Sequence, residues 1–204
     1  MKPPVIIGID QSLSSTGVCI YRPGVRSGAP CTYYNIVASN KLTKKMTQFQ
    51  HPFLTIIPYE RLEGTEYESK ELAKTRNIQS ICQKIRDLIR KHHPGVLVLE
   101  GISYGSVGSA SLVDLAGLNF CIRNLALEMG LEVRIASPMT VKKQATGNGG
   151  ATKDEMIWAW KNCDPNINDL SGIKMDDIAD AYFLARVYEQ DYINKPLTNH
   201  ESKL

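Results

Sequence analysis

Two carboxylates stand at the ends of apolar, strand-like segments. Asp10 follows the run at residues 5–9, and Glu100 follows a second run at residues 95–99. Side chains at the carboxyl ends of strands in an α/β sheet point into the crevice where ligands bind. A polar residue that merely solvates a strand end also explains each acid taken alone, so neither decides the chemistry by itself.

Two further acids, Asp177 and Asp180, belong to the motif DDIADA at residues 176–181, where a helix is predicted to begin. Acids in a first turn often only cap the helix and complement its dipole, and that explanation suits Asp176. At about 100° per residue, Asp177 and Asp180 instead share the arc of the helix's apolar residues, which are Ala181, Leu184, Val187 and Tyr188. They therefore face the body of the protein, where an unpaired carboxylate is costly or becomes protonated.

Asp10, Glu100, Asp177 and Asp180 together are the predicted catalytic and metal-binding residues. No lysine or arginine shares the inward face of the last helix, so a divalent cation is the natural partner of its acids. Hard oxygen ligands without histidine or cysteine favour Mg²⁺, with Mn²⁺ as a substitute, over zinc. A site for one or two such ions suits phosphodiester hydrolysis, in which one ion activates a water and the other stabilises the leaving 3′ oxygen.

Three lysines surround a glycine-rich link at residues 147–150. Lys142 and Lys143 precede the link and Lys153 follows it. Backbone N–H groups of a glycine segment can approach phosphate closely, so these lysines are candidate phosphate contacts. Ordinary solvated lysines would look the same in the sequence, and that alternative stays open.

The elements that must position these residues follow from apolar periodicity. Residues 5–9, 17–21 and 32–38 predict three consecutive antiparallel strands separated by turn-forming residues. Apolar residues at helical spacing predict an amphipathic helix at residues 66–91, which ends before Pro94.

A parallel unit follows. Residues 95–99, 109–129 and 131–136 predict a strand, a helix and a strand, which makes a β-α-β unit. Helices at about residues 152–162 and 177–188 complete the chain. The expected fold class is α/β, with a mixed five-stranded sheet of three antiparallel and then two parallel strands, flanked by helices.

Four segments, in this order and at nearly this spacing, resemble the RuvC family of Holliday-junction resolvases within the ribonuclease H-like superfamily. They are GIDQSLSSTGV at 8–18, LVLEG at 97–101, SPMTVKKQATGNGGATKDEM at 137–156 and DDIADAYFLA at 176–185. The resemblance implies a ribonuclease H-like fold in which the four acids bind metal and Lys142 and Lys153 lie near the phosphates of the cut strand. Ser14, inside the first motif, is a further predicted DNA contact.

The sequence departs from the family pattern at two places. The family usually places an aromatic residue, which wedges bases at the branch point, three residues after the strand-end glutamate. Here that position is Ser103, and Tyr104 is the candidate replacement. An insertion at about residues 39–65 interleaves basic and aromatic residues: Lys41, Lys44, Lys45, Phe49, His51, Phe53, Tyr59 and Arg61. It either contacts a DNA arm by charge and stacking or is a plain hairpin extension, the slightly favoured alternative.

The resemblance implies a crossover junction endodeoxyribonuclease, an Mg²⁺-dependent enzyme that resolves Holliday junctions by paired symmetric nicks. The helix at 109–129 is apolar over much of its girth, and the family dimerises through it, so the expected partners are branched DNA and a second copy of the chain. Three alternatives remain: a related nuclease acting on structured RNA, one acting on forks, and a non-catalytic junction-binding module. A nucleotide-binding ATPase needs two such domains, so no nucleotide cofactor is expected.

Bulk composition sets the remaining expectations. The 204 residues suit one nuclease domain at 1–190 and a polar tail at 191–204, and the net charge of +3 does not by itself indicate a nucleic-acid binder. Scattered cysteines and the lack of a leader or membrane span suggest a cytoplasmic protein, and the terminal Ser202-Lys203-Leu204 is taken as coincidental with a peroxisomal signal. By analogy, a viral or mobile-element source is plausible.

Overall fold

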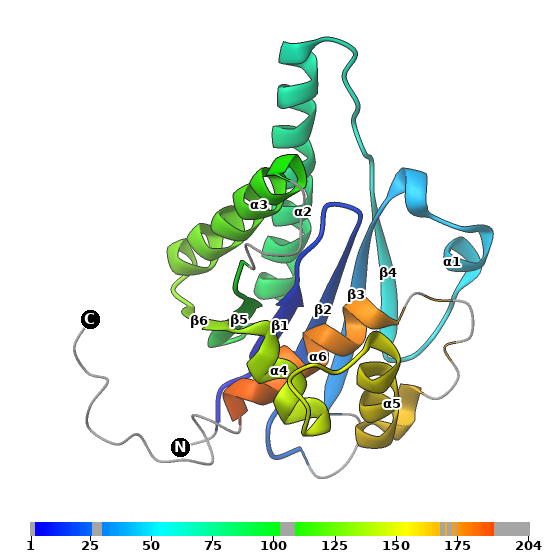
Figure 1. Ribbon diagram of the computed structural model, residues 1–204, viewed down its shortest axis with the longest axis vertical. Helices are drawn as coiled ribbons and strands as arrows, with labels where there is room; N and C mark the ends of the chain where they lie inside the picture. The colour runs from blue at the N-terminus through cyan, green and yellow to red at the C-terminus, as the bar shows by residue number, and fades with distance from the viewer. Residues whose placement is uncertain are drawn as a thin grey trace.

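The computed structural model describes residues 3–25, 30–102, 109–167, 170, 173 and 175–189. These residues form a six-stranded sheet in the order β4-β3-β2-β1-β5-β6, with helices on both faces (Figure 1). The strands are β1 (Ile6–Asp10), β2 (Ser15–Tyr21), β3 (Cys31–Ala38), β4 (Leu54–Tyr59), β5 (Val96–Glu100) and β6 (Glu132–Ala136). The helices are η1 (Ser39–Lys41), α1 (Lys44–Gln48), α2 (Tyr67–His92), α3 (Ser109–Glu128), α4 (Pro138–Thr146), α5 (Lys153–Cys163), η2 (Pro165–Ile167) and α6 (Asp176–Tyr188).

The strand directions agree with the sequence-based prediction. β1 pairs with β2 and β2 with β3 in antiparallel fashion, whereas β5 is parallel to β1 and β6 is parallel to β5. Parallel neighbours need long crossovers, and α2 and α3 occupy those connections. Consequently β1 and β5 both end at the same edge of the sheet.

The predicted strand number is wrong by one, because the insertion at 39–65 contributes a strand. β4 lies parallel to β3 at the edge of the sheet, in a register that runs from Tyr33 opposite Leu54 to Ala38 opposite Tyr59. η1 and α1 make the crossover, so the insertion is not a hairpin extension. Pro58 cannot donate to a ladder and argues against a strand in sequence, but an edge strand tolerates it.

The sheet separates two hydrophobic clusters, because successive residues of a strand point to opposite faces. One cluster contains Ile6 and the buried faces of α5 and α6, together with Met46 of α1. The other contains Ile7 and the buried faces of α2 and α3. Among the described residues, no helix is both long enough and apolar enough to cross a membrane.

Candidate functional site

Helix α6 lies directly on β1 and β2, and two glycines permit this close approach (Figure 1). A Cβ atom on Gly8 would stand 2.2 Å from the carbonyl oxygen of Ala181, and one on Gly17 would stand 2.0 Å from that of Asp177. Real Cβ atoms do not approach backbone atoms so closely. The two glycines therefore set the depth at which α6 presents its acids to the strand ends.

We expect Gly17→Ala to destabilise the fold by at least about 2 kcal/mol, because the added methyl group meets backbone and not a movable side chain. Denaturant unfolding measures the change. Gly117→Ala is the matched control: its Cβ would make an ordinary 3.5 Å contact with Ile78 in the middle of α3, so it should be neutral or slightly stabilising. Equal stability of both variants would show that α6 is not seated on Gly17.

Asp10 and Glu100 end neighbouring parallel strands. The last pair in the β1–β5 register is Ile9 with Leu99, so the two acids follow at matching positions on strands about 4.8 Å apart. Asp10 also pairs with Gly17, which lies beneath the main chain of Asp177. The topology thus brings Asp10, Glu100 and the first turn of α6 to one edge of the sheet.

The acids act on each other electrostatically. Burial and the charge of Asp180 raise the pKa of Glu100 to about 7, while Lys142 opposes the shift. Burial, followed by the charges of Asp176 and Asp177, raises the pKa of Asp180 to about 6. Carboxylates that are half-buried beside like charges have an excess of negative charge that a cation would relieve.

The three lysines predicted to contact DNA differ in burial and in their charged neighbours. Lys142 is half-buried and lies within electrostatic range of both Glu100 and Asp180. Lys153 extends into solvent and pairs with Asp176 at 2.7 Å, which gives Asp176 a structural role. Lys143 is exposed on α4.

The structure gives less support to the other two predicted DNA contacts, Ser14 and Tyr104. The Ser14 carbonyl accepts a 3.0 Å hydrogen bond from the Ala38 amide, and its hydroxyl lies 3.2 Å from that of Ser12, so the residue braces the turn after Asp10. Tyr104 lies outside the described residues.

The four acids do not form a closed cage in the structure. Within the described part of the chain, no group of three or more histidine, cysteine, aspartate or glutamate side chains is close enough to hold a metal ion. The residues nevertheless fit a divalent cation in their oxygen-donor chemistry and in the mutual repulsion that raises two pKa values. Their closure around an ion stays a prediction.

Two buried amides that the sequence analysis did not select hold the end of β5. Asn119 of α3 donates to the carbonyl oxygen of Glu100 at 3.0 Å, and Gln11 donates to the same oxygen at 3.4 Å. Asn119 is fully buried. Nothing in the local sequence sets Asn119 apart, because α3 also contains Asp114, Arg123, Asn124 and Glu128.

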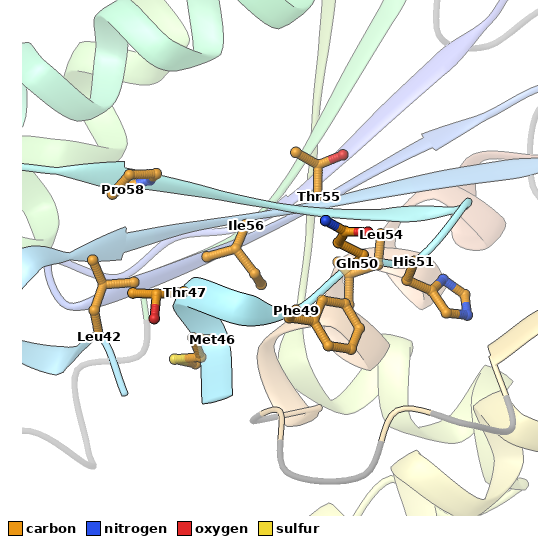
Figure 2. Close-up of a pocket in the computed structure, with 10 residues that line it drawn as sticks. All are labelled: Leu42, Met46, Thr47, Phe49, Gln50, His51, Leu54, Thr55, Ile56 and Pro58. Atoms are coloured by element: carbon orange, nitrogen blue, oxygen red, sulfur yellow. The ribbon is translucent and has the colours of Figure 1, made fainter. Parts of the chain in front are cut away.

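Asp10, Glu100, Asp177 and Asp180 do not line the following hollows of the described surface. One of about 420 Å³ lies between α1 and β4 (Figure 2), one of about 530 Å³ beside the end of β4 and α2, and one of about 780 Å³ between α2 and α3.

The family profile described as crossover junction endodeoxyribonuclease RuvC matches residues 64–187. The chain belongs to the RuvC family. The matched span contains Glu100, Asp177, Asp180 and the three candidate lysines, whereas Asp10 precedes it. Family membership makes this RuvC-family chain a nuclease of the crossover-junction type and decides against an ATPase and a non-catalytic module.

Known proteins agree with this assignment. RuvC of Neorickettsia sennetsu, named a crossover junction endodeoxyribonuclease, is 31% identical over 144 residues, which are 64% of this chain and 81% of that protein. Thermus thermophilus RuvC, solved in complex with a Holliday junction substrate, has a TM-score of 0.60 at 15% identity, over 91% of this chain and 93% of that one. The yeast mitochondrial Holliday junction resolvase Ydc2 has a TM-score of 0.55 at 14% identity, over 91% and 77%. These structural likenesses confirm the ribonuclease H-like fold class.

Proposed function

We propose that this RuvC-family nuclease hydrolyses phosphodiester bonds in four-way DNA junctions by paired symmetric nicks that depend on Mg²⁺. The observation that carries the proposal is the meeting of Asp10, Glu100 and the first turn of α6 at one sheet edge, where two carboxyl pKa values are raised by burial and like charge. Family membership supplies the reaction class.

Asp10, Glu100, Asp177 and Asp180 would hold one or two divalent cations. When bound, such ions lower the pKa of a water and stabilise the leaving 3′ oxygen. Asp10 pairs with Gly17 beneath Asp177 and lies on the strand next to Glu100, so it would hold a cation together with these acids. Asn119 and Gln11 keep the end of β5 in place through the Glu100 carbonyl.

The lysines position the substrate in this proposal. Lys142, which faces Glu100 and Asp180, is placed to contact the phosphate that undergoes cleavage. Lys143 and Lys153 are exposed and would contact flanking phosphates, and Ser14 and Tyr104 complete the predicted contacts. A phosphate near Lys153 would compete with Asp176 for its ammonium group.

The direct test uses three synthetic substrates of equal length: a four-way junction, a fork and a linear duplex. We expect Mg²⁺-dependent nicks at symmetric positions in the junction, weaker cutting of the fork and none of the duplex. Mn²⁺ should replace Mg²⁺. Cutting that requires no divalent ion, or that is equally fast on the duplex, would contradict the proposal. A junction of the same sequence made of RNA decides between DNA and structured RNA as the substrate.

Paired nicks require two active sites, and α3 offers a face for a second copy of the chain. Val113, Phe120 and Leu127 are 70%, 58% and 62% exposed, which is unusual for large apolar side chains. Phe120 also borders the hollow between α2 and α3. A two-fold dimer through this face would present two equivalent sites to a symmetric junction.

We expect sedimentation at micromolar concentration to give a dimer for the natural chain and a monomer for Phe120→Glu, because a buried unpaired carboxylate opposes association. Tyr67→Glu is the control: Tyr67 is 83% exposed at the start of α2, away from that face. The monomeric variant should also nick the two strands independently. A monomeric natural chain would argue against the dimer.

A further inference from the structure

We propose that residues 39–59, here called the basic insert, form a docking surface for one arm of the branched DNA. The inference rests on the proposed function and names where the substrate continues beyond the cutting site. The family profile begins at residue 64, so the basic insert lies outside the family match.

Charge distribution is the first observation. The basic insert contains Lys41, Lys44, Lys45 and His51 and no aspartate or glutamate. The chain as a whole has nearly balanced charge, with 24 basic and 21 acidic residues, and the basic insert is the lysine-rich end of a longer stretch, residues 11–59, that contains no aspartate or glutamate. The residues that follow are rich in acid. The segment 60–71 contains five glutamates: Glu60, Glu63, Glu66, Glu68 and Glu71. The basic insert therefore complements a polyanion, and the neighbouring stretch does not.

Position is the second observation. β3 and β4 run parallel to β1 and β5, so the η1 segment that follows β3 lies at the same sheet edge as Asp10 and Glu100. The turn after Asp10 is tied to this region, because the Tyr59 hydroxyl donates to the carbonyl of Leu13 and the Ala38 amide donates to that of Ser14. β3 is two strands from β1, which is about 10 Å across the sheet.

That separation corresponds to about three nucleotides at a rise of 3.4 Å each. A DNA strand with its scissile phosphate at the carboxylates would reach the basic insert within the same arm. Met46 belongs to the hydrophobic cluster against which Leu42 and Met175, the N-cap of α6, also pack, so α1 is anchored on the face of the sheet that carries α6.

The orientation of α1 leaves its lysines available. Met46 is buried, while Lys44 and Lys45 are exposed. Figure 2 shows Met46 and Thr47 beside the groove between α1 and β4, and at helical spacing Lys45 falls on the opposite side of Met46 from Thr47. The groove is thus separate from the lysines, which point toward solvent.

The groove has an aromatic rim of its own, formed by Phe49 and His51 ahead of β4. The rings of Phe49 and His51 lie nearly parallel, at 14° with centroids 6.0 Å apart (Figure 2). Nδ1 of His51 accepts the Phe53 amide at 3.3 Å, so its other ring nitrogen is the one that can donate to an incoming group. Lysines that contact phosphates and aromatic faces that stack on unpaired bases are the combination by which proteins bind single strands without sequence preference.

The test compares Lys44→Ala/Lys45→Ala with the natural chain in binding to a four-way junction at several salt concentrations. Removing two phosphate contacts should lower the slope of log K against log salt by about 2 and weaken binding roughly tenfold at moderate salt. Single-turnover cleavage at saturating protein should stay within about twofold of the natural rate, since the lysines lie outside the cutting site.

Two further variants serve as controls. Lys44→Arg/Lys45→Arg should bind as the natural chain does, and Lys70→Ala/Arg90→Ala removes two exposed charges from α2, outside the basic insert. An unchanged salt slope in Lys44→Ala/Lys45→Ala, or an equal loss in the α2 control, overturns the inference, as does a natural chain that binds no branched DNA. If the natural chain binds but does not cut, the proposed function fails while the binding comparison still decides the inference.

Discussion

Asp10→Asn is expected to abolish Mg²⁺-dependent cleavage of a four-way junction, by at least about 10³-fold, while junction binding is retained. Asn keeps the shape of the side chain but removes the charge that would attract a cation between Glu100 and Asp177. Because the change also removes a negative charge from the sheet edge, the DNA affinity should be equal or slightly higher. Single-turnover cleavage and a binding titration on the same junction measure the two quantities separately.

Asp87→Asn is the matched control, because Asp87 is exposed on α2 and bonded only locally to Gln83. It should cut at the natural rate. Junction cleavage by Asp10→Asn that approaches this control would remove Asp10 from the catalytic set. Loss of both binding and cleavage, with a lowered melting temperature, would instead assign Asp10 to the fold.

Glu100→Gln is expected to stabilise the metal-free protein at pH 8 by about 1–3 kcal/mol, or about 2–4 °C in melting temperature for each kcal/mol. Burial and the charge of Asp180 raise the pKa of Glu100 from 4.5 to about 7. The ionised carboxylate therefore destabilises the folded chain above pH 7. Between pH 7 and pH 4.5 the folded state takes up the proton first and the penalty disappears, so the advantage of the Gln variant should vanish below pH 4.5.

Added Mg²⁺ should reverse the order of stability in this pair. The natural chain gains the free energy of binding the cation, whereas the variant, with one predicted ligand neutralised, gains less. Glu68→Gln is the control, because Glu68 is an exposed acid in the first turn of α2. A pH-independent difference between Glu100→Gln and the natural chain would contradict the assigned origin of the shift.

The elements that agree best with the sequence are those whose pattern is local. α2 and α6 follow from apolar residues at helical spacing, and their observed bounds differ by one residue at most from the predicted ones. β4 was not predicted, because the segment Leu54–Tyr59 contains a proline and its apolar residues do not alternate with polar ones. It is a strand only because β3 offers it a partner, and that pairing joins residues on either side of α1.

The sequence also predicted which acids make up the candidate site. It did not predict how their side chains are arranged. The predicted acids occupy adjacent backbone positions, yet their side chains do not form a cage in the described structure. The pairing of Lys153 with Asp176, and the support of Glu100 by Asn119 and Gln11, have no local signal. Each depends on which helix crosses which strand.

By itself, the sequence determined which residues carry acid, which face of the last helix Asp177 and Asp180 occupy, and which segments form a parallel pair. These properties depend on the types of residues and on their spacing within short segments of the sequence. Only the tertiary structure decided how closely α6 approaches Gly8 and Gly17, how strongly Glu100 and Asp180 resist ionisation, and that η1, where the basic insert begins, lies at their edge of the sheet. Those depend on burial and on distances between residues far apart in the chain, which local periodicity does not encode.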